Sequence, residues 1–311
     1  MTDELNIKTL KEAMMSSEFP NFFKKGLKTL LLKAYNESPR LYEKCVHFET
    51  SDRDKEEYPA LGAAPEPTKV LQGQEFPHFG LLNEFITITN YKYGEIMEIA
   101  RELIEDEQTR QLKNIPSMLG QAHARFENNT VFTFYNNGAT ATAYDAQNYF
   151  DTAGHPDITG GAAVAVNTNS GALGQISEAN LETALAEIRL WRGRQGEHIV
   201  VFPKVLLVAP SEEFVSRRLM KSGYEVGSNL GHITNIHEGS MEVIVSPWLT
   251  TQTWYILTDI PGLVYQWRQK LDLLQEDIAS GSSFDTDVYR YRSLVRFGLD
   301  ATDWRFGYKG N

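Results

Sequence analysis

The chain has 311 residues, enough for two domains of ordinary size, and 41% of them are hydrophobic, which is ample for a buried core. The net charge of -11 argues against binding nucleic acid or an anionic membrane through bulk charge, although an acidic protein can still enclose nucleic acid. A single cysteine, Cys45, excludes an intrachain disulfide and is typical of assembly in a reducing cytoplasm. No apolar run is long enough to span a membrane, and the polar, acidic N-terminus is not a secretory signal.

The first segment, from Leu5 to Tyr35, is predicted to be helical because lysines alternate with apolar residues. Pro20 is expected to divide it, with Asn21 as the cap of a second helix. Two interpretations remain open. The helix either packs on its own domain or forms an arm on a neighbouring subunit.

The segment from Thr50 to Phe79 has a different character. A solvated charge run, Ser51 to Glu57, is followed by prolines and glycines at short intervals up to Pro77. This composition predicts neither a helix nor a core. The segment is therefore either disordered or an extended arm that finds its partners on another chain.

The middle of the chain alternates helices and strands. Ile86 to Thr89 is predicted as a strand. The residues after Tyr91 are ambiguous, because Tyr91, Tyr93, Met97 and Ile99 partly alternate as in a strand, although periodicity alone favours a helix. Val131 to Tyr135 is predicted as a strand, followed by a turn at Asn136 to Gly138. Before Val131, a long amphipathic helix kinked at Pro116 is predicted. Its apolar face is Leu112, Ile115, Leu119, Ala122 and Phe126.

The later part of the chain has the clearest pattern. After a loop from Asp151 to Gly174, a helix from Glu178 to Trp191 is predicted, with Ser177 as its cap and Leu181, Leu185 and Ile188 on one face. Val200 to Asp259 predicts an α+β module with a mixed or antiparallel sheet. It contains a strand, a helix capped by Ser211 with Phe214, Val215 and Leu219 on its apolar side, and the strands Met241–Val245 and Thr253–Thr258. Gln266 to Asp277 is predicted as extended or helical, and the aromatic C-terminus as a strand returned to the core.

Residues that could carry chemistry are few. No phosphate-binding loop, nucleophile elbow or zinc-protease helix is present, and Gly160-Gly161 lacks a following phosphate cradle. His232 and His237 have no nearby cysteine or carboxylate pair to complete a metal site. We therefore predict no catalytic residue, no cofactor site and no metal site.

The remaining polar candidates have structural interpretations. His155 is expected to anchor a loop rather than act as a base, Asp145 and Asp151 are ordinary loop carboxylates, and Cys45 with His47 is a weak thiolate pair. We expect Arg290, Arg292 and Arg296 to lie on the solvent side of an edge strand rather than to contact phosphate.

A series of short motifs, each weak alone, resembles the Mu-like prophage major head subunit family of tailed-phage capsid proteins from about Phe19 to the C-terminus. The motifs occur in the family's order and spacing: Glu57–Gly62 in the Pro/Gly arm, Ile88–Tyr93 before Arg101–Glu107, Leu119-Gly120 with Ala122 in a helix, Phe150-Asp151 before Gly154–Pro156, Leu206–Pro210 before Ser246–Leu249 and Trp254–Leu257, and Arg296–Gly298 near the end.

The resemblance implies the α+β Hong Kong 97-like capsid fold. It implies an N-terminal arm (1–45), an extended E-loop hairpin (46–103), a peripheral domain with a long spine helix (104–175 and 284–311) and an axial domain with a mixed sheet (176–283). It also implies that Glu95 to Leu103 is the return strand of the hairpin, against the helical periodicity. The short polar N-terminus shows no scaffolding domain or protease segment, so a scaffold is expected to be separate or already removed.

The function that this implies is a non-enzymatic major capsid protein of a tailed bacteriophage or prophage. Its copies would form pentamers and hexamers of an icosahedral shell around double-stranded DNA, assembled in the bacterial host cytoplasm, with portal, scaffold and decoration proteins as further partners. Two alternatives remain: a related shell protein that encloses protein cargo, and an α+β enzyme that uses His155 or His232.

Overall fold

The computed structural model describes residues 19–59, 67, 69–76, 78, 85–100, 102, 114–156, 167–193, 196–224, 234–275 and 288–310. The chain divides into two compact units. Unit 1 comprises Met1–Arg40, Tyr91–Glu127 and Gln269–Phe297, and unit 2 comprises Leu41–Asn90, Asn128–Arg268 and Gly298–Asn311. Within the described residues, no helix is both long and apolar enough to cross a membrane.

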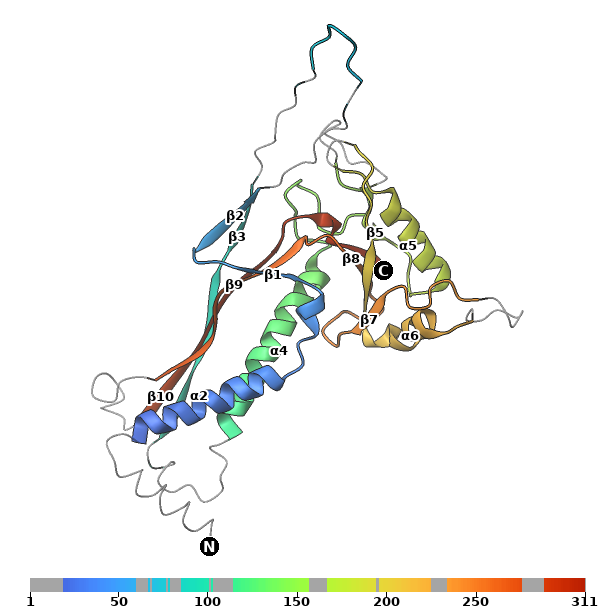
Figure 1. Cartoon of the computed structure of the whole chain (residues 1–311). Helices are drawn as coiled ribbons and strands as arrows, with labels where there is room; N and C mark the ends of the chain where they lie inside the picture. The colour runs from blue at the N-terminus through green and yellow to red at the C-terminus, as the bar shows by residue number, and fades with distance from the viewer. Residues whose placement is uncertain are drawn as a thin grey trace. The chain divides into compact units, whose positions relative to one another are not determined.

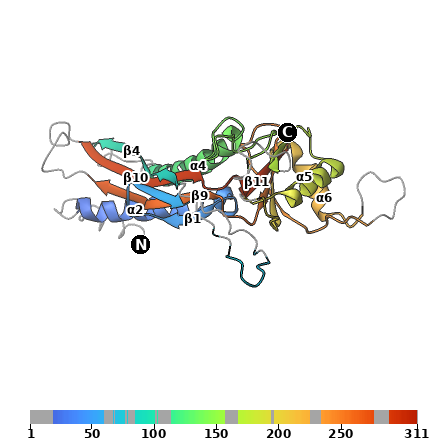
Figure 2. The same ribbon diagram turned by 90° about the horizontal axis from the view of Figure 1, so that it is seen from above.

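In its described residues, unit 1 combines helices α2 and α4 with long strands (Figures 1 and 2). Strand β4 pairs antiparallel with β10 from Ala100 opposite Val288 to Tyr91 opposite Phe297. In the sheet order, β10 lies between β9 and β4. The elements of this unit, some of which continue into unit 2, are α2 (Phe19–Glu37), β4 (Tyr91–Ala100), α4 (Asn114–Asn137), β9 (Leu263–Gln275) and β10 (Val288–Ala301).

Helices α2 and α4 approach each other closely at Gly120. A Cβ atom at Gly120 would overlap the carbonyl oxygen of Leu31 and lie 3.0 Å from the amide nitrogen of Tyr35. Leu31 is fully buried, and the Tyr35 hydroxyl donates a 2.6 Å hydrogen bond to the buried carboxylate of Glu127. The contact therefore combines close backbone packing with a satisfied polar pair.

The predictions for α2 are partly wrong. Helix α2 begins at Phe19, so Pro20 lies in its first turn and Asn21 lies inside the helix instead of capping it. Proline is tolerated there because the first-turn N–H groups have no partner within the helix. The division of two helices at Pro20 stays a prediction, because it depends on residues before Phe19. The predicted helical residues before Phe19 lie outside the described residues.

Helix α4 is longer than the sequence suggested, because the predicted strand Val131–Tyr135 and the residues up to Asn137 belong to it. Pro116 is in its first turn, where proline is tolerated as at Pro20, so the predicted mid-helix kink is wrong. The buried stripe also differs from the predicted face. It consists of Pro116, Gly120, His123, Ala124, Glu127, Asn128, Val131, Phe132 and Tyr135, whereas Ile115, Leu119, Ala122 and Phe126 are only partly buried.

Tyr91 to Ala100 is a strand, as the resemblance implied and the periodicity did not. Its partner differs from the expected one, however. The hairpin is formed by β2 (Lys55–Pro59) and β3 (Phe85–Thr89), while β4 pairs with β10. Strand β9 resolves the ambiguity at Gln266 to Asp277 in favour of an extended conformation up to Gln275.

Unit 2 contains the predicted module and a mixed sheet of order β5-β11-β8-β6-β7 (Figure 1). Strand β6 is parallel to β7 and antiparallel to β8, which confirms the α+β prediction. Ser177 caps α5 as predicted, by accepting a hydrogen bond from the Asn180 amide. The elements are η1 (Leu41–Lys44), β1 (His47–Thr50), β5 (Ser170–Gly171), α5 (Glu178–Leu190), β6 (Pro203–Val208), η4 (Pro210–Glu212), α6 (Glu213–Lys221), β7 (Glu242–Val245), β8 (Trp254–Thr258), η5 (Trp304–Phe306) and β11 (Gly307–Gly310).

The core of unit 2 lies between α5, α6 and this sheet. The aromatic C-terminus contributes to it as predicted, since Trp304 and Tyr308 are buried beside Trp191 and Trp254. Two expectations for α6 are wrong. Ser211 lies in the preceding η4 turn and its hydroxyl accepts a hydrogen bond from the Gln252 amide, and Phe214 points outward with 74% of its surface exposed.

Candidate assembly surfaces

The β2–β3 hairpin is a two-stranded ladder that pairs with no other strand in the described part of the chain. Lys55 lies opposite Thr89, and Pro59 lies opposite Phe85. An isolated two-stranded ladder is marginally stable in water and presents unpaired backbone groups on both edges. Phe85 is 55% exposed at its outer end. The hairpin therefore has free edges and an apolar end that another chain could cover.

The root of the hairpin is fixed by a polar network. The buried Asn90 side chain donates to the Ser51 hydroxyl at 3.0 Å and to the Arg53 carbonyl at 2.9 Å, and Ser51 donates to Glu56 at 2.8 Å. Tyr58 donates a 2.8 Å hydrogen bond to the Gln266 side chain in β9. These contacts hold the root of the hairpin in place within unit 2.

Apolar contacts hold the same root. Ile88 is buried, and a Cβ atom at Gly298 would lie 2.9 Å from its Cγ2 atom and 2.8 Å from the carbonyl oxygen of Thr89. A side chain at position 298 would therefore push β3 away. Together with the polar network, this contact makes the hairpin a supported element and not an unattached loop.

Several large apolar side chains of unit 2 are exposed. Single exposed apolar residues are normal on a protein surface, and association between subunits could cover them. The residues concerned are Leu190, Val200, Phe202, Phe214, Tyr224 and Ile236, each between 54% and 79% exposed.

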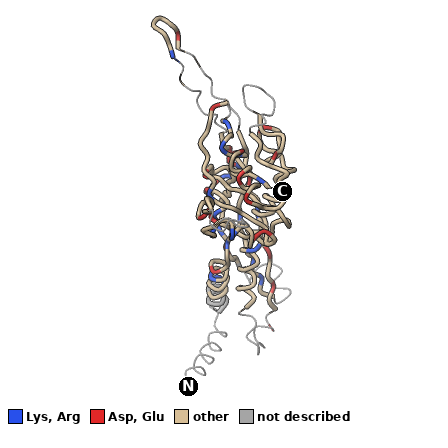
Figure 3. Tube along the Cα trace, turned by 90° about the vertical axis from the view of Figure 1, so that its right-hand side faces the viewer, with Lys and Arg blue, Asp and Glu red and all other residues tan. Residues whose placement is uncertain are grey.

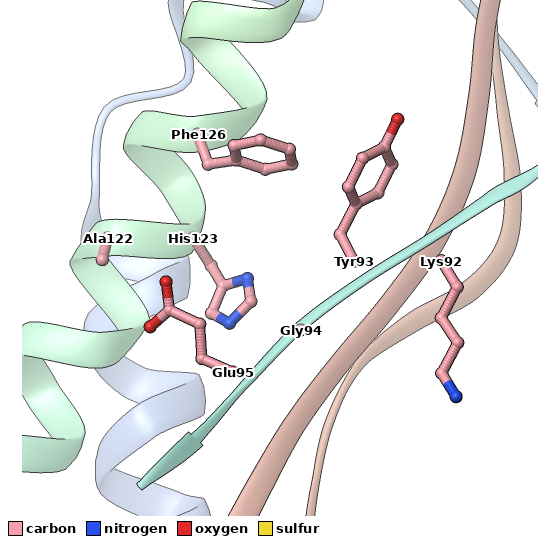
Figure 4. A pocket seen from close by; sticks show the side chains of 7 residues that line it. All are labelled: Lys92, Tyr93, Gly94, Glu95, Ala122, His123 and Phe126. Atoms are coloured by element: carbon pink, nitrogen blue, oxygen red, sulfur yellow. The ribbon is translucent and has the colours of Figure 1, made fainter.

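In unit 1, an open pocket of about 310 Å³ lies between α4 and β4 (Figure 4). The rings of Tyr93 and Phe126 face each other across it with centroids 4.9 Å apart, and Phe297 lies 4.8 Å from Tyr93. His123 forms a 2.9 Å hydrogen bond with Ser293 in β10. Burial lowers the pKa of His123, while the Glu95 carboxylate acts in the opposite direction. The pocket holds no assembled nucleophile and base, so its contacts are those of packing.

His155 anchors a loop, as the sequence predicted. It is fully buried, with Nδ1 2.6 Å from an Asp145 carboxylate oxygen and Nε2 3.2 Å from the Asn169 side-chain oxygen. Its ring stacks on Trp304 at 4.2 Å. Asp151 belongs to the same region, where its amide donates to Asn169. Both ring nitrogens are occupied and no surface reaches them, so His155 has no access to a substrate.

The other candidates fall in separate places. Cys45 is buried, and this burial raises the pKa of its thiol to about 12, while His47 is exposed beside Glu49. His232 and Gly160-Gly161 lie outside the described residues, and His237 is buried in unit 2.

The arginines of β10 do not lie on an edge strand, because β10 is internal to its sheet. Arg290 forms an ion pair with Glu98 at 2.7 Å across the ladder. Figure 3 shows basic and acidic residues interspersed along the described trace. This distribution does not resemble the basic stripe of a protein that binds nucleic acid tightly.

Comparison with known proteins gives a family and a fold. The family described as phage capsid protein matches residues 84–310. The procapsid of bacteriophage JBD30 is similar with 18% identity and a TM-score of 0.55, covering 95% of this chain and 75% of that chain. No curated protein is significantly similar in sequence.

Two further solved structures come from different sources. The structure from Mycobacterium phage Bobi has 14% identity and a TM-score of 0.54, covering 86% of this chain and 85% of that one. The virus-like particle from Pyrococcus furiosus has 11% identity and a TM-score of 0.53, covering 93% and 99%. At these identities the likeness concerns the fold, which is Hong Kong 97-like.

Proposed function

The chain belongs to the phage capsid protein family, and we propose that its copies form pentamers and hexamers that close an icosahedral shell around double-stranded DNA. Its role is structural and not enzymatic, and its location is the virion capsid. The observation that carries the proposal is the family match over residues 84–310, which includes β3, the spine helix α4 and the whole mixed sheet.

The hairpin supports assembly between copies of the chain. A supported ladder with two open edges gains stability when a neighbouring subunit covers it, because its backbone groups and Phe85 then leave water. The exposed apolar residues of unit 2 would also leave water wherever a neighbouring subunit covers them.

The charge of the chain supports enclosure of DNA without tight binding. With a net charge of -11 and interspersed signs, the shell would repel the phosphate backbone weakly, and the packaged DNA could leave again. An enzyme that uses His155 is not favoured, because that ring is fully buried with both nitrogens occupied.

We also propose, from its ordered motifs, that the chain belongs to the Mu-like prophage major head subunit family. In this proposal the chain divides into an N-terminal arm (1–45), an E-loop (46–103), a peripheral domain (104–175 and 284–311) and an axial domain (176–283). Assembly would take place in the bacterial host cytoplasm, with portal, scaffold and decoration proteins as further partners.

The role of the E-loop can be tested by shortening it without removing its strands. Because Pro59 lies directly opposite Phe85, a two-residue Asn-Gly turn can replace residues 60–84 and close the ladder. We expect this variant to keep the circular dichroism spectrum and unfolding midpoint of the unassembled subunit but to form no stable shells in sedimentation velocity.

Two results would contradict the E-loop proposal. Normal shells from the shortened chain would mean that residues 60–84 make no essential contact between subunits. An unfolded variant would mean that the segment belongs to the core of the subunit. As a matched control, Lys69→Ala alters one exposed side chain in the same segment and should assemble normally.

The enclosed material distinguishes the two kinds of shell. Particles purified from a host that produces the complete phage should contain double-stranded DNA, measured by the ratio of absorbance at 260 and 280 nm after nuclease treatment of the exterior. Particles that contain protein cargo and no DNA would favour the alternative of a cargo-enclosing shell.

A further inference from the structure

A buried histidine and two carboxylates meet between α5 and the segment that follows α6. The side-chain ligand atoms of Glu178, Glu182 and His237 all lie within 4.8 Å of one another, and His237 Nε2 is 3.6 Å from a Glu182 carboxylate oxygen. Glu178 and Glu182 are four residues apart on α5, so they share one face of the helix. Both α5 and α6 pack on the core of unit 2 (Figure 1).

Among the described residues, the imidazole nitrogen nearest the Glu182 carboxylate has no hydrogen-bond partner. His237 is only 5% exposed, and its Nε2 atom is buried with no described donor or acceptor within hydrogen-bonding distance. A buried polar atom is normally paired, and leaving it unpaired destabilises the fold because the atom has lost its hydrogen bond to water. An unpaired nitrogen that points at two carboxylates therefore requires an explanation.

The position of His237 is fixed by its backbone. Its amide donates to the side chain of Asn235 at 2.9 Å, and its carbonyl accepts from the hydroxyl of Ser240 at 2.9 Å. Asn235 in turn donates to the carbonyls of Leu219 and Ser222, at the end of α6. The histidine is thus held in place before any ligand binds, which lowers the entropic cost of binding.

We propose that Glu178, Glu182 and His237 form a binding site for a divalent transition-metal ion of the zinc type. One imidazole nitrogen and two carboxylate oxygens are a ligand set that such ions accept, with a fourth position for water. Ligands about 2.0–2.1 Å from a tetrahedral ion lie about 3.3 Å apart. The 3.6 Å separation of His237 and Glu182 is close to this value, and the other separations, within 4.8 Å, would shorten as the two exposed or half-buried carboxylates turn toward the ion. The bound ion would connect α5 to the segment 234–240, where an isolated bridge pairs Tyr224 with Thr234.

A simpler arrangement would be an ion pair between a protonated His237 and Glu182. That pair leaves the 3.6 Å separation outside hydrogen-bonding range and gives Glu178 no part in the contact. A metal ion uses all three side chains. The two arrangements also differ in what they predict on addition of zinc, and this difference is the basis of the test.

The experiment is a calorimetric titration of unassembled, full-length chain with Zn²⁺ after removal of metals by a chelator. We expect one equivalent to bind and to raise the unfolding midpoint, with affinity at least tenfold lower in Glu182→Gln and His237→Gln. Glu238→Gln, next to His237 but outside the group, is the matched control and should bind as the unaltered chain does. Co²⁺ should give the intense visible absorption of a four-coordinate site in the unaltered chain and in Glu238→Gln, but not in Glu182→Gln or His237→Gln.

The outcomes separate the arrangements. Equal zinc binding by the unaltered chain and by both ligand variants would overturn the proposal. The absence of any zinc-dependent signal would also overturn it, because the three side chains would then form an imidazolium–carboxylate pair only. Loss of binding in Glu238→Gln would place the ion elsewhere and also overturn it. Because Glu182 is exposed, Glu182→Gln should fold normally, so the test does not depend on the buried His237→Gln variant alone.

Discussion

Substitution of Gly120 by alanine tests the close packing of α2 against α4. The added methyl group would overlap the Leu31 carbonyl oxygen and lie 3.0 Å from the Tyr35 amide nitrogen, so the two helices must separate. Overpacking of this kind costs about 1–3 kcal/mol. Alanine also gains about 1 kcal/mol over glycine in helix propensity, so the net loss in the free energy of unfolding is up to about 2 kcal/mol.

Gly26 in α2 provides a matched control. It is a helical glycine with no atom within 4 Å of an added Cβ, so Gly26→Ala has the propensity gain without the clash and should stabilise the chain by up to about 1 kcal/mol. The measurement is urea unfolding of unassembled subunits, followed by circular dichroism. If Gly120→Ala stabilised the chain as much as Gly26→Ala does, the close helix contact would be wrong.

Three further predictions concern side chains in the two units. Phe126→Ala should lower the free energy of unfolding by about 2–3 kcal/mol because it opens the aromatic cluster with Tyr93 and Phe297 beside β4. Gln121→Ala, at an exposed position of α4, should change the free energy of unfolding by no more than about 0.5 kcal/mol. Equal losses in urea unfolding would contradict the packing of Phe126 against β4. Burial lowers the pKa of His123 in the folded chain, so its contribution to the free energy of unfolding is complete above the unfolded pKa of about 6.5 and is lost as the pH falls below that value. His123→Gln should therefore flatten the dependence of stability on pH between about 7 and 5, as measured by urea unfolding at each pH. An unchanged slope would refute this. With its pKa raised to about 12 by burial, the Cys45 thiol should resist maleimide at pH 7.5 until the chain unfolds, which mass spectrometry can follow, and rapid labelling of the native chain would contradict its burial.

The sequence predicted the elements with local signals and missed those decided by distant contacts. Helix α5 and its Ser177 cap were predictable because the cap, the apolar face and the helix end lie within a few turns. Val131 to Tyr135 is rich in β-branched and aromatic residues, which favour strands in isolation. In the fold this segment continues α4, where the buried Val131, Phe132 and Tyr135 lie on the helix face that packs inward.

Strand β4 shows the opposite error. The apolar residues between Tyr93 and Ile104 fit a helical period, yet Tyr91 to Ala100 pairs with β10, about two hundred residues later in the chain. No local signal reports such a partner, and tertiary pairing overrides the weak periodic preference. A partial alternation and the resemblance to a family were the indications of a strand there.

The candidate metal site was missed for a similar reason. His237 was judged by its spacing from His232, whereas the carboxylates beside it come from α5, more than fifty residues earlier. The burial of Gly120 and Glu127 on α4 was also invisible, because their partners Leu31 and Tyr35 lie in α2. The fold buries both residues and satisfies the Glu127 carboxylate with a hydrogen bond from Tyr35.

Electron cryo-microscopy of the purified full-length chain under assembly conditions can show directly whether the protein forms a shell. We expect closed shells built from hexamers and pentamers, in which the β2–β3 hairpin of one subunit lies against a neighbouring copy. A monodisperse monomer of 35.2 kDa, or particles in which the hairpin contacts no other subunit, would contradict it.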